Sequence, residues 1–66
     1  MVKNRLKEIR MREYMMNQKV FAEFIEIDIK SLSNWERNIS RPNLEIALKI
    51  AKKLNKKVED IWYLED

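Results

Sequence analysis

Lysine and arginine side chains are the functional groups of this chain that could bind another molecule, because the chain offers few nucleophiles or metal ligands. The sequence holds 14 Lys and Arg residues against 11 Asp and Glu residues, which gives a formal net charge of +3. The cations dominate residues 1–19 and 44–57, whereas the charged residues of 20–28 are all acids. This segregation could present a basic face to a polyanion such as nucleic acid, although ordinary solvated helix faces give the same pattern.

The residue types that are missing exclude several kinds of site. The chain has no cysteine and no histidine, which excludes disulfides, thiolate metal sites and imidazole acid–base catalysis. It has no glycine, which excludes a glycine-rich phosphate loop. An enzyme is disfavoured, because a domain this small also lacks a plausible carboxylate pair in a pocket. We therefore expect no catalytic residues, no metal and no cofactor, and no small-molecule ligand is evident.

Length and hydropathy set the class of the protein. The 66 residues make one small domain whose core alone leaves a thin margin of stability, so a partner subunit or a bound ligand would help. No apolar run approaches the roughly 20 residues that a membrane span needs, and the polar N-terminus does not resemble a signal peptide. We therefore expect a cytoplasmic protein without a membrane partner. Abundant Lys, Glu, Leu and Ile without glycine favour an all-helical fold.

Capping residues and apolar spacing predict five short helices. The first covers about residues 3–13. Asn17, Asp28 and Asn43 are good N-caps for the next three helices, and Asn38 and Asn55 can take the left-handed position after the third and the fourth. A last turn or two covers about residues 58–63. The inward positions are Leu6, Ile9, Phe21, Ala22, Ile25, Leu32, Trp35, Leu44, Ala47, Leu48, Ala51, Leu54, Val58, Ile61 and Trp62, with Met11, Met15 and Met16 at the edge of the core.

The second and third helices are the most informative element. About nine residues of helix, a turn near residues 26–28 and a second short helix match a helix-turn-helix. By periodicity alone this is only a short helical hairpin, and such hairpins are common. A more specific signal must come from the residue types.

That signal lies in seven short segments: Asn17–Gln18, Phe21–Ala22, Ile27–Asp28, Leu32, Trp35–Asn38, Pro42–Leu44 and Ile50–Leu54. In order and spacing, over about residues 3–62, they resemble the helix-turn-helix family of Cro and phage-type repressors, which includes the xenobiotic-response-element-like regulators. The resemblance implies an all-α fold, a compact five-helix lambda-repressor-like domain over residues 1–66, with the helix-turn-helix at the second and third helices. Members of this family are mostly dimeric transcriptional regulators.

The resemblance also implies which residues contact double-stranded DNA. The third helix would enter the major groove, with Ile29, Lys30, Ser33 and Asn34 at the base-reading positions. Lysine can donate to guanine O6 and N7, asparagine can pair with adenine N6 and N7, and isoleucine can pack on a thymine methyl group. Arg10 and Glu36 match a structural salt bridge. Phosphate contacts are implied for Gln18, Ser31, Arg37, Ser40, Arg41 and Asn43.

The sequence departs from the family pattern in three places. Glu26 stands where the turn usually has glycine, and a positive φ there costs on the order of 1 kcal/mol. Asp28 stands where serine or threonine is more common, so its carboxylate would face phosphate oxygens or take Lys30 as a counter-charge. Residues 11–17 are one residue longer than the commonest spacing, which leaves the end of the first helix undetermined.

Two functions of different classes follow. The first is a sequence-specific transcriptional regulator, most often a repressor in this family, that binds a near-palindromic operator as a homodimer. Its interface would be the apolar C-terminal segment Ile61, Trp62, Tyr63 and Leu64, and Met1 and Val2 could join Tyr63 and Leu64 as a short strand pair. The alternative is a protein-interaction module such as an antitoxin or anti-regulator, against which the absence of an extra partner-binding arm argues.

Overall fold

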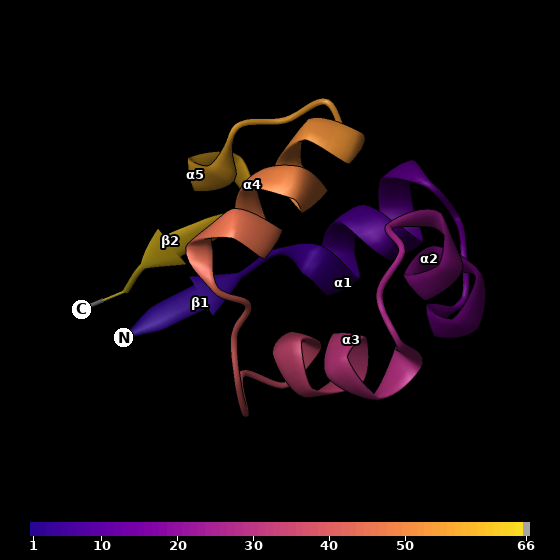
Figure 1. Cartoon of the computed structure of the whole chain (residues 1–66), viewed down its shortest axis with the longest axis horizontal. Coiled ribbons are helices and arrows are strands. Elements are labelled where there is room, and N and C mark those ends of the chain that lie inside the picture. Colours follow the sequence, from indigo (N-terminus) through magenta and orange to yellow (C-terminus); the bar gives the residue numbers. More distant parts are fainter. Residues whose placement is uncertain (66) are drawn as a thin grey trace.

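Helices make up most of the computed structural model, which describes residues 1–65 (Figure 1). The first helix runs from α1 directly into a π-helix, η1, so the expected five helical segments are confirmed. No helix within residues 1–65 is both long enough and apolar enough to cross a membrane. The elements in chain order are β1 (Val2–Asn4), α1 (Leu6–Glu8), η1 (Ile9–Glu13), α2 (Gln18–Phe24), α3 (Ile29–Glu36), α4 (Leu44–Lys53), α5 (Val58–Ile61) and β2 (Trp62–Leu64).

Three N-caps start α2, α3 and α4 where the sequence predicts them. The side-chain oxygens of Asn17, Asp28 and Asn43 accept hydrogen bonds from the backbone N–H three residues later, at 2.8, 3.0 and 2.8 Å. Each bond satisfies one of the N–H groups that the first turn of a helix leaves without a partner. The caps therefore fix where both helices of the helix-turn-helix begin.

Four non-glycine residues lie in the left-handed region of backbone space. Asn38 and Asn55, with φ of 61° and 57°, confirm the predicted helix ends. Glu26, with φ of 61°, confirms the expected strain in the turn between α2 and α3. Met15, with φ of 50°, is a fourth such residue that the sequence pattern does not predict. A side chain with a Cβ atom costs roughly 1–2 kcal/mol in this region, so Glu26 and Met15 are the strained positions.

The extra residue between positions 11 and 17 is taken up by the π-helix. In η1 the Tyr14 N–H donates to the Ile9 carbonyl at 3.2 Å, which is a bond to the fifth residue back. Such a wide turn absorbs one more residue than an α-helical turn does. Ile9 therefore stays in the core at 2% exposure, and Asn17 still reaches the start of α2.

Met11 and Met15 do not lie at the edge of the core as predicted. They are 54% and 85% exposed, because they belong to the segment that the π-helix and the left-handed residue reshape. Met16 is half-buried and packs against the core, as expected.

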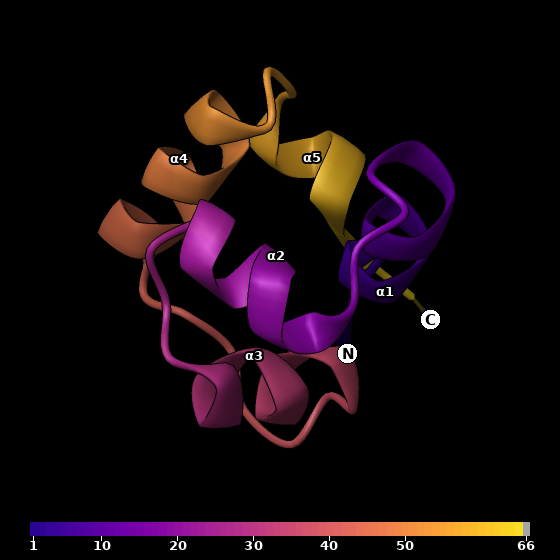
Figure 2. The ribbon, with the colours of Figure 1, turned by 90° about the vertical axis from the view of Figure 1, so that its right-hand side faces the viewer.

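The core lies between the five helices (Figure 2). Leu6, Phe21, Leu32 and Ile61 are completely buried and come from α1, α2, α3 and α5. The core thus connects α3 to α1 and to α5, and α3 packs on the domain through its buried face.

In α4 the apolar stripe is rotated from its predicted position. Leu44 and Leu48 are 69% and 53% exposed, so the prediction that they face inward is wrong. Ile50, which is 1% exposed, is buried instead and belongs to the core together with Ala51. Both sets have helical spacing, and only packing against the rest of the domain selects between them. The rotation leaves two leucines on the surface.

The two ends of the described chain pair as an antiparallel ribbon. The predicted helices over residues 3–13 and 58–63 are therefore wrong at Lys3–Asn4 and at Trp62–Tyr63, which are strand residues. The expected strand pair of Met1 and Val2 with Tyr63 and Leu64 is confirmed for Val2, Tyr63 and Leu64, whereas Met1 lies outside the strand. Tertiary pairing overrides helix propensity here, since aromatic and β-branched residues fit a ribbon well. The register pairs Val2 with Leu64, Lys3 with Tyr63 and Asn4 with Trp62.

Candidate nucleic-acid interface

Helix α3 lies at one edge of the molecule and packs on α2 with its apolar face (Figures 1 and 2). Leu32 is fully buried and Trp35 is 8% exposed. The opposite face carries the predicted base-reading residues: Ile29 and Lys30 are exposed, and Ser33 and Asn34 are half-buried. The helix therefore presents a largely polar face to solvent, while Trp35 packs in the core on its opposite face.

At the start of α3, two hydrogen bonds join Ser31 to the Asp28 carboxylate. The Ser31 N–H donates to Oδ2 of Asp28 at 3.0 Å, and the Ser31 hydroxyl donates to Oδ1 at 2.7 Å. These bonds, the hydroxyl bond first, hold the pKa of Asp28 below its ordinary value of 3.8, and the Lys30 charge adds less. Because a hydroxyl has one proton, Ser31 in this arrangement does not offer a donor to a phosphate, contrary to its predicted role.

At the end of α3, Arg37 folds back along the helix. Its Nη2 donates to Oδ1 of Asn34 at 3.1 Å, and its Nε donates to the Ser33 carbonyl at 3.4 Å. Two predicted DNA-contacting residues, one for bases and one for phosphates, are therefore joined in one arrangement. The sequence gives no signal for this contact beyond their spacing of three residues.

The predicted Arg10–Glu36 pair is present and has a third member. Arg10 Nε and Nη2 donate to the two Glu36 carboxylate oxygens at 2.8 and 3.1 Å. Gln18 Nε2 donates to Glu36 Oε1 at 3.0 Å. One N–H of the Gln18 side chain is therefore used within the protein. A phosphate at this place would meet the second side-chain N–H and the backbone N–H groups at the start of α2. The network joins the first helix to both helices of the helix-turn-helix.

Comparison with known proteins agrees with this geometry. Residues 6–61 match the family model of the helix-turn-helix domain. The chain belongs to the helix-turn-helix family of Cro and phage-type repressors. It is 32% identical over 65 residues to the uncharacterized HTH-type transcriptional regulator YgzD of Bacillus subtilis (strain 168), a match that covers 98% of this chain and 97% of that protein. This helix-turn-helix regulator has the all-α lambda-repressor-like fold, and it is a DNA-binding transcriptional regulator.

Further predicted phosphate residues of the helix-turn-helix regulator lie in the loop between α3 and α4. Ser40, Arg41 and Asn43 are all exposed, and Asn43 also caps α4. Lys19, exposed in the first turn of α2, is a cation that the sequence analysis did not single out. A cation in the first turn of a helix interacts unfavourably with the helix dipole, and an anion bound nearby would compensate for this. The position of Lys19 in the first turn of α2 is therefore a signal that could have identified it as a phosphate contact.

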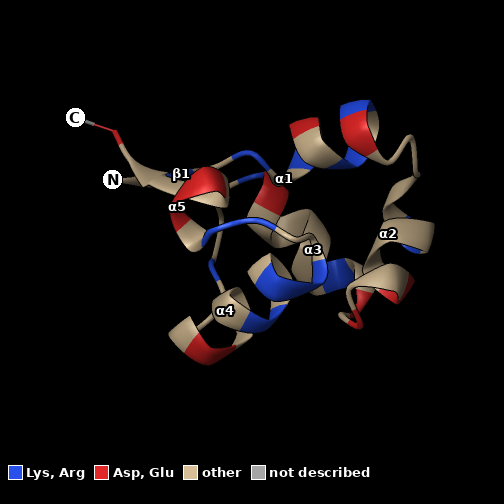
Figure 3. Cartoon of the chain, turned by 90° about the horizontal axis from the view of Figure 1, so that it is seen from above, with Lys and Arg blue, Asp and Glu red and all other residues tan. Residues whose placement is uncertain are grey.

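The lysines of residues 44–57 lie on α4 and in the segment between α4 and α5, where Figure 3 shows blue ribbon. Three of them form ion pairs: Lys49 with Glu45 at 3.2 Å, Lys53 with Glu26 at 3.4 Å, and Lys56 with Glu13 at 2.9 Å. The hydrogen bond to Glu13 is the main reason that the pKa of Lys56 is raised. Three of the five lysines of residues 44–57 are thus paired with carboxylates within the helix-turn-helix regulator.

The C-terminal residues predicted to form a dimer interface do not all reach the surface. Ile61 is completely buried in the core, so its placement in an interface is wrong: its position in the last turn of α5 directs it inward. Trp62 and Tyr63 are half-buried in β2, and Leu64 is 79% exposed. The strand alternation places Trp62 and Leu64 on the same face of the ribbon, and Tyr63 on the other.

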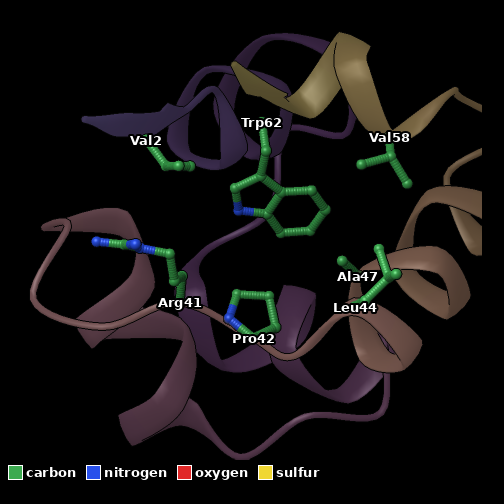
Figure 4. Close-up of a pocket in the computed structure, with 7 residues that line it drawn as sticks. All are labelled: Val2, Arg41, Pro42, Leu44, Ala47, Val58 and Trp62. Atoms are coloured by element: carbon green, nitrogen blue, oxygen red, sulfur yellow. The ribbon is translucent and has the colours of Figure 1, made fainter. Parts of the chain in front are cut away.

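Beside Trp62 the surface is hollowed by about 250 Å³ (Figure 4). The indole ring of Trp62 projects into this hollow, with the loop between α3 and α4 beneath it. Its Nε1 atom is buried and has no hydrogen-bond partner within residues 1–65. The hollow is mostly apolar and is lined by Val2, Arg41, Pro42, Leu44, Ala47, Val58 and Trp62.

Proposed function

We propose that this regulator is a repressor that binds a near-palindromic operator as a homodimer, with α3 in the major groove. The observation that carries the proposal is the placement of α3, whose apolar face is buried while Lys30 is exposed and Asn34 is half-buried on the opposite face. A helix presented in this way fits the width of the major groove. Because such binding requires access to the genome, the proposal places the regulator in the cytoplasm.

The contacts expected at this surface fall into two groups. Ile29, Lys30, Ser33 and Asn34 would meet base edges, and they carry the sequence specificity. Phosphates would be held by Arg37 and Arg41, by Ser40 and Asn43, and by the N-terminal turn of α2 that contains Gln18 and Lys19. These contacts set the register on the duplex and make binding salt-dependent, because each neutralised phosphate releases counterions.

The homodimer is supported by the apolar surface around the hollow beside Trp62. Leu44, Leu48 and Leu64 are 69%, 53% and 79% exposed, which is unfavourable for a domain of this size standing alone. We propose an interface formed by Leu44 and Leu48 of α4 together with Trp62 and Leu64, with Tyr63 at its edge. It keeps three of the four residues that the sequence indicates and replaces the buried Ile61.

A symmetric dimer also solves the problem of specificity. A single α3 reads only a few base pairs, whereas two copies about 34 Å apart read two half-sites on one face of the duplex. A two-fold axis through such an interface predicts an inverted repeat in the operator. Repression would then follow if the bound dimer covers a site that RNA polymerase needs.

The test is fluorescence anisotropy with duplexes obtained by selection from a random pool. Binding with a steep negative dependence on salt and an inverted repeat in the selected duplexes are expected. Asn34→Ala should reduce affinity at particular base pairs, whereas Arg41→Ala should weaken binding to all duplexes alike. Absence of binding to any duplex at low salt would overturn the proposal. Stoichiometric co-purification of another protein in that case would favour the interaction-module alternative.

A further inference from the structure

We infer that Asn34 reads a guanine, not an adenine, and that Arg37 sets this preference by its contact with Asn34. The inference rests on the proposed function, because it concerns the base edges that α3 would meet in the major groove. It replaces the bidentate adenine contact that an asparagine makes when its amide is free.

Two acceptor groups beside the outward side of α3, those of Asn34 and Asp28, already accept hydrogen bonds within the protein. Asn34 Oδ1 accepts from Arg37 Nη2 at 3.1 Å. Both carboxylate oxygens of Asp28 accept from Ser31, at 3.0 and 2.7 Å. The Nδ2 group of Asn34 and the ammonium group of Lys30, by contrast, are donors. A helix surface with engaged acceptors and available donors matches a base edge that consists of acceptors.

Among the bases, guanine presents that edge most fully. Its N7 and O6 atoms are both acceptors in the major groove, whereas adenine pairs an acceptor with the N6 amino donor. Thymine offers one acceptor beside its methyl group, and cytosine offers an amino donor. A pair of acceptors is therefore the best complement to Asn34 Nδ2 and its neighbour Lys30.

The charges around Asn34 favour the same base. Lys30, Asn34 and Arg37 are spaced by four and three residues, which places them in one row along α3. An adenine amino group that approached Asn34 Oδ1 would come close to the guanidinium that already donates to this oxygen. A guanine O6 in the same place carries partial negative charge and would be attracted to both cations.

Arg37 is held where it can act in this way. Its Nε atom donates to the Ser33 carbonyl at 3.4 Å while Nη2 donates to Asn34, so the guanidinium lies along the last turn of α3. Arg37 is thus a positioning residue for Asn34. It also has guanidinium N–H groups left for the predicted phosphate contact.

The experiment first locates the base. Duplexes selected by the wild-type chain and by Asn34→Ala differ at the position that Asn34 reads, where we expect guanine. In anisotropy titrations, inosine at this position keeps the affinity, because inosine retains O6 and N7. Adenine lowers the affinity about tenfold, which is within the discrimination of one good base contact.

Two arginine variants then separate the two possible roles of Arg37. Arg37→Ala should weaken binding to all duplexes and also bring the guanine-to-adenine affinity ratio close to one. A residue that only contacts phosphate would leave the ratio unchanged, which is the behaviour expected of the matched control Arg41→Ala.

Three results overturn the inference while leaving the proposed function intact. They are selection of any base other than guanine at the Asn34 position, no difference in selection between the wild-type chain and Asn34→Ala, and an unchanged affinity ratio in Arg37→Ala. Failure of the wild-type chain to bind any duplex at low salt overturns the inference and the proposed function together.

Discussion

Arg10 Nε lies 2.8 Å from Glu36 Oε2, and the two side chains are only 10% and 3% exposed. The pair is a bidentate ion pair that is almost closed off from solvent. Arg10 Nη1 also donates to the Met16 carbonyl at 3.0 Å, just before the helix-turn-helix begins. Each charge is therefore compensated mainly by the other, and the pair holds α3 against the first helix.

Replacing one member of this pair should be costly. Arg10→Met leaves the Glu36 carboxylate buried without its counter-charge, and we expect the free energy of unfolding to fall by about 3–5 kcal/mol. Urea unfolding followed by circular dichroism measures the change. The double variant Arg10→Met, Glu36→Leu should recover most of the loss, because it leaves no buried charge. A loss below about 1 kcal/mol in the single variant would contradict the buried geometry.

The strained turn between α2 and α3 offers a stabilising substitution. Glu26 has φ of 61°, where glycine avoids the clash of a Cβ atom. We expect Glu26→Gly to be more stable to urea than the control Glu26→Ala by about 1 kcal/mol. The control removes the same exposed ion pair with Lys53 but keeps the Cβ atom. Equal stabilities of the two variants would show that the turn is unstrained.

Asp28 should make stability depend on pH at the acid end. Because hydrogen bonds from Ser31 lower its folded-state pKa below 3.8, the ionised carboxylate stabilises the fold above the unfolded-state pKa. That contribution is lost as the pH falls through the folded-state pKa. Asp28→Asn keeps an N-cap but does not titrate. Melting curves should show the wild-type chain losing stability relative to Asp28→Asn from about pH 4.5 downward, and parallel curves would contradict this.

The exposed leucines of α4 allow a test of the dimer. Leu48→Glu should give a monomer in sedimentation velocity and lower operator affinity by at least roughly tenfold, because the free energy of pairing the two half-sites is lost. Its helix content should stay the same, since Leu48 is 53% exposed and lies outside the core. Met11→Glu is the control of matched exposure, because Met11 is 54% exposed and lies on η1, outside α4 and the ribbon. A dimeric Leu48→Glu protein would exclude this interface.

Local chemistry accounts for what the sequence predicts well. Asn17, Asp28 and Asn43 identify helix starts because a short side chain bonds the N–H three residues later, which needs no information from the rest of the fold. Asn38 and Asn55 identify helix ends for a similar reason, since asparagine tolerates the left-handed region. The placement of Lys30 and Asn34 on the face of α3 opposite Leu32 and Trp35 follows from these boundaries and helical periodicity.

Long-range packing accounts for what the sequence does not predict. Leu44 and Leu48 share a helical spacing with Ala47 and Ala51, so periodicity cannot tell the buried stripe from its exposed neighbour. The strand conformation of Lys3–Asn4 and Trp62–Tyr63 depends on the ribbon, which pairs residues far apart in the chain. The contact between Arg37 and Asn34 depends on a side-chain conformation. These features need the folded coordinates.

The ribbon between β1 and β2 has a consequence for how the protein is made. A ribosome synthesises Val2–Asn4 well before Trp62–Leu64, so the nascent chain carries the first of these strands unpaired while the helices between them are made. The helices between them can form early from local contacts, because such contacts need little loop closure. The β1–β2 ribbon can form only after β2 has left the exit tunnel of the ribosome.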